Sequence, residues 1–132
     1  MVKHSSLKYI FVIVCVSYSN CIIGQKDADE KFVKSNFDDA YNLYSTYPLE
    51  KLTPEQVYRM AVSVLNGSTY SKIQAIELLE KYLENNSTDG NARYLYGRAL
   101  AFEQRFDEAE KQFYYYHRSC GIYEFYQCRI VW

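Results

Sequence analysis

The chain has 132 residues, of which 48% are apolar and 23% charged, so it has room for one globular domain. The formal net charge is −1, and lysine and arginine form no concentrated cluster, which argues against nucleic acid as a partner. Tyrosine is unusually frequent, at 15 residues. Because its ring fills gaps between helices while the hydroxyl stays hydrated, we expect most of these tyrosines to serve packing.

Residues 1–24 have the pattern of a targeting segment. Lys3 and Lys8 precede a continuous apolar run at residues 9–16. A basic start followed by about 7–15 apolar residues is typical of a secretory signal peptide, whereas a membrane-spanning helix needs roughly 20. We expect cleavage after this segment; the alternatives are an uncleaved anchor or lipid attachment at Cys21. The sequence therefore predicts an exported protein, periplasmic, envelope-associated or extracellular, that meets a membrane only if the segment is retained.

Two short helices are expected next. A charged stretch with a thin apolar thread predicts a helix at 26–34, and residues 37–45 follow as its partner. Pro48 lies beyond this second helix. Because proline cannot continue a helix, the pair is complete before that residue.

The clearest local signal in the sequence starts at Thr53. This residue is placed to cap a helix, Pro54 suits the first helical position, and Gln56 completes a capping box. The helix is expected to run to about residue 65. Asn, Gly and Ser at 66–68 then predict a turn.

Three further helices complete the expected array. Apolar residues at helical spacing predict an amphipathic helix at 71–84, and a polar loop at 85–90 separates it from helices at 91–103 and 106–117. The aromatic tail at 122–132 is interpreted as a capping segment or as the truncated start of another helix.

Small residues recur at a regular interval along the chain. Ala109 follows Ala75 by 34 residues, and Ala75 follows Ala40 by 35. Each of these alanines has a large residue four places on, namely Tyr44, Leu79 and Phe113. Residues four apart lie on one helix face, so the alanine lets a neighbouring helix approach while the large side chain fills the next gap. The pattern predicts buried alanines in packed helix pairs.

These residues resemble a tetratricopeptide repeat. The 34-residue spacing, Tyr96 and Gly97 in the first helix, the sequence at 105–109 and Phe113 carry the resemblance. Three positions depart from the family pattern: Ser87, Arg93 and Leu100. The resemblance implies an all-α fold, with residues 25–121 forming a short solenoid of antiparallel helix pairs, about two and a half to three repeats long.

The resemblance also implies a working surface. In the family the first helix of each pair lines the concave side, and the matching positions are Gln56, Arg59, Ser63, Asn91, Tyr94, Arg98 and Phe102. Two arginines on such a face would hold a carboxylate, and the aromatic rings would stack on apolar groups of an extended peptide. Surface arginines that only solvate a helix are the alternative.

The expected function is a non-catalytic scaffold that binds a protein or peptide partner. A scaffold of stacked helix pairs is ordered before its partner arrives, so less entropy is lost on binding. Two alternatives remain open. The chain is the amino-terminal, substrate-presenting part of a larger enzyme or envelope assembly, or it is a membrane-anchored accessory subunit.

No catalytic, cofactor or metal site is indicated by the sequence. His4 and His117 are the only histidines, and no nucleophile or phosphate-binding motif is present. His117, Cys120 and Cys128 lack the spacing of a zinc module. The two cysteines are either bridged or free thiols, because an exported chain permits a disulfide but the sequence gives no sulfur geometry. Patterns for N-linked sugar occur at Asn66, Asn85 and Asn86.

Overall fold

The computed structural model describes residues 24–68 and 71–119. Every regular element in these two ranges is helical, as the sequence predicts. A helix at 24–33 is followed by α2 (Phe37–Tyr44), the single 3-10 turn η1 (Leu49–Lys51), α3 (Pro54–Asn66), α4 (Ile73–Asn85), α5 (Gly90–Phe102) and α6 (Phe106–Ser119). In this part of the chain, no helix is long and apolar enough to cross a membrane.

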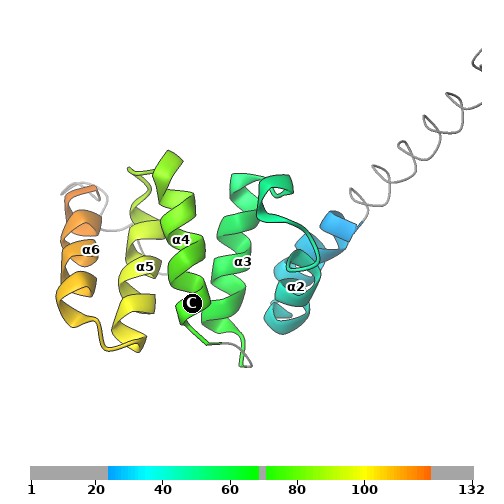
Figure 1. Ribbon diagram of the computed structural model, residues 1–132, viewed down its shortest axis with the longest axis horizontal. Helices are drawn as coiled ribbons and strands as arrows, with labels where there is room; N and C mark the ends of the chain where they lie inside the picture. The colour runs from blue at the N-terminus through cyan, green and yellow to red at the C-terminus, as the bar shows by residue number, and fades with distance from the viewer. Residues whose placement is uncertain (1–23, 69–70, 120–132) are drawn as a thin grey trace, which may run out of the picture.

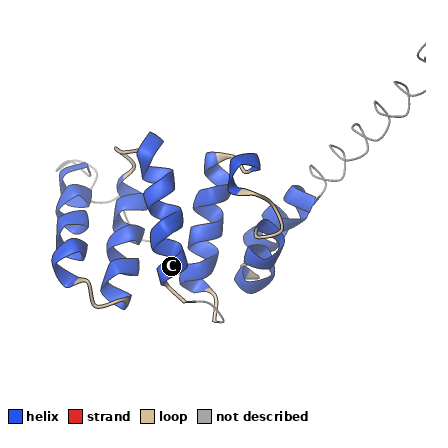
Figure 2. Ribbon diagram, viewed as in Figure 1, coloured by secondary structure: helices blue, strands red, loops and turns tan. Residues whose placement is uncertain are grey.

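The helices lie side by side in the order of the chain, from α2 at one end to α6 at the other (Figure 1). Short loops join them (Figure 2). Each helix from α2 to α6 packs against the next one along the chain, and α3 also contacts α5 directly. The row is therefore built from local contacts, as in an array of helical hairpins.

Side chains at both ends of α3 fix where this helix starts and stops. The Gln56 amide donates to the Thr53 hydroxyl over 3.3 Å and the Thr53 amide donates to the Gln56 side chain over 3.0 Å, so the predicted capping box is confirmed. At the other end of α3, the Lys72 ammonium donates to the carbonyls of Val64 and Gly67. These bonds satisfy backbone groups that the helix ends leave unpaired. Lys72 lies immediately before α4. This helix begins two residues later than the sequence predicts.

The repeated alanines lie in the core. Ala40 and Ala75 are fully buried and Ala109 is 3% exposed, which confirms the prediction made from their spacing. Ala28, on the helix at 24–33, and Ala61, on α3, are also fully buried. Small buried residues thus occur on every helix pair, and they let neighbouring helices approach closely.

Gly97 plays the same part where α5 meets α6. A methyl group at this position would lie 2.6 Å from the Phe113 ring. The missing side chain therefore leaves the space that the ring occupies. Gly97 and Phe113, which both carry the resemblance to a tetratricopeptide repeat, thus pack against each other.

Several predictions fall outside the described residues. They concern the targeting segment up to residue 23, the cysteines at 120 and 128, and the tail at 122–132. The three glycosylation patterns lie at helix ends: Asn66 and Asn85 are exposed final residues of α3 and α4, whereas Asn86 is half-buried and its side chain donates to the Tyr82 carbonyl over 3.0 Å.

Candidate binding face

Two residues assigned to the binding face do not reach the surface. Ser63 is fully buried, and its hydroxyl donates to the Arg59 carbonyl over 2.8 Å. Gln56 is 8% exposed and is held by the capping box of α3. Both side chains belong to the interior of the array, so their assignment to a partner-binding surface is corrected.

The correction has a geometric cause. The predicted set aligned Gln56 with Asn91, which lies 35 residues further on. The two helix caps, Thr53 and Asp89, are 36 residues apart, and so are the small buried residues Ala61 and Gly97. Because an α-helix has 3.6 residues per turn, a slip of one residue turns the assigned face by about 100°.

In the corrected alignment, α3 and α5 present equivalent stripes. We call these eight residues the inner face: Glu55, Tyr58, Val62 and Asn66 on α3, and Asn91, Tyr94, Arg98 and Phe102 on α5. On both helices the first and last residues are exposed and the two between them are half-buried. The two helices also contact each other directly.

The α5 half of the inner face is aromatic. The Tyr94 ring lies 5.9 Å from Phe113 and 5.3 Å from Tyr116, so α6 fixes its position. Phe102, near the turn into α6, is 56% exposed. Arg98, the predicted carboxylate ligand, lies between them and is half-buried. Four of the residues predicted from the sequence thus remain on the inner face, all of them on α5.

Arg59 lies beside this face but is occupied by other groups of the chain. Its guanidinium is 3.1 Å from Asp29 on the helix at 24–33 and 3.1 Å from Glu55 one turn earlier on α3. It also lies over the Phe32 ring. The Tyr44 hydroxyl donates to the same Asp29 carboxylate. This network ties the helix at 24–33 to α2 and α3, so the prediction that Arg59 holds a partner's carboxylate is replaced by a structural role.

The Tyr44 phenol in that network is fully buried. Burial, together with its hydrogen bond to Asp29, raises the pKa of this phenol well above its usual value. The phenol therefore stays protonated and remains a donor to the carboxylate.

A second cluster joins α3, α4 and the start of α5. The Tyr82 hydroxyl donates to Asp89 over 2.9 Å, and the other oxygen of that carboxylate accepts from the Ala92 amide as the N-cap of α5. The Tyr58 ring lies 5.2 Å from Tyr82. Burial raises the pKa of both phenols to about 12, with the Asp89 charge contributing. The cluster holds Tyr58 in place on the inner face.

Arg93, a departure from the family pattern, connects α5 with α6. Its guanidinium donates to the Gln112 side chain over 2.8 Å and to the Ser87 carbonyl over 3.0 Å, and it lies over the Tyr115 ring. Polar contacts and ring stacking thus take the place of an apolar residue. Leu100, another departure, is fully buried.

Sequence reasoning missed the α3 half of the inner face. The signal that could have found it was present: Thr53 and Asp89 are both good N-cap residues, and aligning the two caps gives the correct register. The described residues contain no group of histidine, cysteine and carboxylate side chains placed to bind a metal.

No protein-family model matches the chain, and a search of curated proteins finds no significant match.

Proposed function

We propose that this chain is an exported, tetratricopeptide-like scaffold that binds an extended peptide segment of a partner protein along the inner face. The observation that carries the proposal is the pair of equivalent stripes on α3 and α5, with partly exposed rings flanked by exposed asparagines. The amino-terminal sequence supports export, because its basic start and apolar run are typical of a signal peptide.

The chemistry of the inner face suits an extended peptide. Asn66 and Asn91 are exposed, and each carries an amide that can both donate to and accept from a peptide main chain. Tyr58, Tyr94 and Phe102 offer rings for the peptide's apolar side chains. The α3 and α5 helices are held by caps and by their neighbours, so little ordering is needed when the partner arrives.

The experiment compares capture of partners by the mature protein and by the variant Asn91→Ala/Phe102→Ala. Both side chains are exposed, so circular dichroism is expected to be unchanged. Truncation of an anchoring ring and a main-chain ligand is expected to weaken binding about tenfold or more.

A matched control comes from α4, which contributes no residue to the inner face. Gln74→Ala/Glu77→Ala changes two exposed residues there and is expected to capture the partner as the unaltered protein does. Equal capture by the inner-face variant and the control would reject the proposal. Arg59 is left unchanged because its loss would disturb the network with Asp29.

A further inference from the structure

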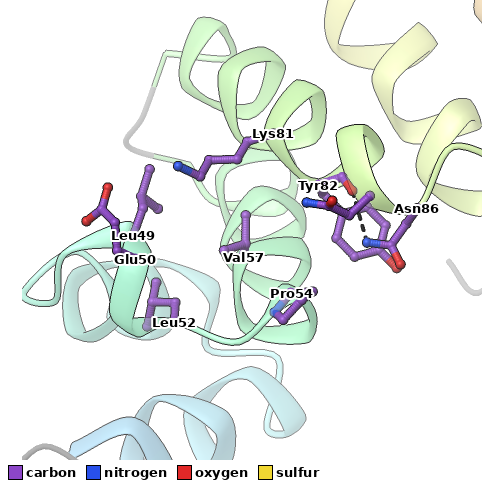
Figure 3. Close-up of a pocket in the computed structure, with 9 residues that line it drawn as sticks. Leu49, Glu50, Leu52, Pro54, Val57, Lys81, Tyr82 and Asn86 are labelled. Atoms are coloured by element: carbon purple, nitrogen blue, oxygen red, sulfur yellow. Dashed lines mark hydrogen bonds between the residues drawn. The ribbon is translucent and has the colours of Figure 1, made fainter.

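A pocket of about 180 Å³ lies outside the inner face. Its walls come from η1, the start of α3 and the last turns of α4 (Figure 3). Four apolar residues line it, namely Leu49, Leu52, Pro54 and Val57, and the polar side chains around them include Glu50 and Lys81. Leu52 and Val57 are buried, so the interior is apolar and the charged groups belong to the exposed edge.

Size limits what the pocket can hold. Small-molecule sites usually enclose about 300–1,000 Å³ and bury most of the ligand, whereas a cavity of about 150 Å³ is enough for one benzene ring. A volume of about 180 Å³ therefore suits a single apolar side chain. An apolar side chain that enters such a pocket is the usual anchor of a protein partner.

The charges at the mouth indicate what flanks that side chain. Glu50 projects from η1, and Lys81 reaches from α4 towards the same side of the pocket (Figure 3). Neither side chain takes part in a hydrogen bond or ion pair within residues 24–68 and 71–119, and both are exposed. Two opposite charges are thus available on two walls of one apolar pocket.

We propose that this pocket binds a segment of a partner protein that carries one large apolar residue with one basic and one acidic residue close to it in the sequence. The apolar side chain enters between Leu49, Leu52 and Val57. The basic neighbour pairs with Glu50, and the acidic neighbour pairs with Lys81. This site shares no residue with the inner face, so a negative result at one site does not bear on the other.

The test uses two synthetic heptapeptides that differ in one charged residue. Both are blocked at their ends and carry glycine pairs around a central triplet, which is lysine, leucine, aspartate in one and lysine, leucine, lysine in the other. Binding is followed through the NMR methyl signals of Leu49 and Leu52, which line the pocket. The peptide with one lysine and one aspartate is expected to bind about fivefold more tightly than the peptide with two lysines, because it matches both exposed charges whichever way the chain runs.

The decisive variant reverses one charge. Lys81→Glu is expected to invert the preference between the two peptides, because both exposed charges are then negative, whereas Glu50→Lys is expected to keep it. Both residues are exposed and unpaired in the described part of the chain, so the fold should be retained. Replacing the central leucine of the peptide with alanine is expected to abolish the methyl shifts.

Three results would overturn the proposal. They are unchanged Leu49 and Leu52 signals with both peptides, a preference for the lysine–aspartate peptide that survives Lys81→Glu, and equal shifts caused by free L-leucine, which would indicate a small-molecule site instead.

Discussion

Arg59 connects the first described helix to the rest of the array through one guanidinium group. About a quarter of its side chain is exposed, at 28%, and the Asp29 side chain is 31% exposed, so solvent only partly screens their attraction. Asp29 also accepts from the buried Tyr44 hydroxyl. The attachment of the helix at 24–33 therefore depends on charge and hydrogen bonding as well as on apolar contact.

Replacing Arg59 with Met is expected to lower the free energy of unfolding by about 1–3 kcal/mol, because a charged hydrogen bond is lost and Asp29 keeps only one partner. Chemical denaturation measures the change. Asp29→Asn and the double variant complete a cycle, and the two effects should be coupled rather than additive. Additive effects would show that Arg59 and Asp29 act independently. Lys81→Met, at an exposed and unpaired cation, is the matched control.

Ionisation of Tyr82 makes the free energy of unfolding depend on pH in the alkaline range. Burial, with the hydrogen bond to Asp89, raises the pKa of Tyr82 from 10.0 to about 12. Its contribution to stability is therefore complete below pH 10 and is lost as the pH rises towards 12, because the unfolded chain releases the proton first. Urea denaturation at a series of pH values should show the free energy of unfolding falling over this range.

In the variant Tyr82→Phe, the free energy of unfolding should fall less steeply with pH. Part of the fall should persist, because Tyr58 is still present and its pKa is also raised to about 12. Tyr114→Phe, at a ring that is 59% exposed, is the matched control. An identical slope for Tyr82→Phe and the unaltered protein would contradict the assignment.

The contact between α5 and α6 determines which residue fits in the middle of α5. Glycine lowers the stability of a helix interior by roughly 1 kcal/mol relative to alanine. Gly97 is nevertheless placed in the middle of α5, where the Phe113 ring occupies the space of a side chain. The packing between two elements thus overrides the preference of one.

Gly97→Ala is therefore expected to destabilise the protein by about 1–3 kcal/mol, although alanine is the better helix former. The free energy of unfolding from chemical denaturation measures the effect. In a background carrying Phe113→Leu, the smaller side chain leaves room for the new methyl group, and the same substitution should cost less or become stabilising. A stabilising effect of Gly97→Ala in the unaltered protein would refute the explanation.

Across the whole molecule, stability depends on contacts between neighbours. The central helix α4 packs against α3 on one side and α5 on the other, and Ala75 is fully buried within it. In a linear array, damage to a central element weakens the coupling between the two ends. The consequences should therefore extend beyond the altered helix.

Ala75→Leu is expected to lower the free energy of unfolding by about 1–3 kcal/mol through overpacking. Native-state hydrogen exchange should then show reduced protection in α3 and α5 as well as in α4. Gln74→Leu adds the same residue at the exposed neighbouring position and should change stability by less than about 0.5 kcal/mol. Loss of protection confined to α4 would contradict a coupled array.

Local sequence patterns are enough to predict the helices and many of the buried positions on them. Thr53, Pro54 and Gln56 specify the start of α3 through local hydrogen bonds, and the spacing of Ala75 and Ala109 predicts which helix faces are buried. These features depend on residues a few positions apart, so periodicity and capping rules are enough to find them.

The surface that each helix presents depends on the register between helices and on contacts between residues far apart in the sequence. The predicted alignment of Gln56 and Ser63 with α5 is one residue out of register. A shift of one residue is enough to assign a buried helix face to the surface. The role of Arg59 depends on Asp29, 30 residues earlier, and the pocket depends on η1 meeting the end of α4. Such contacts follow from how loops of different length bring helices together, and a local sequence pattern does not contain that information.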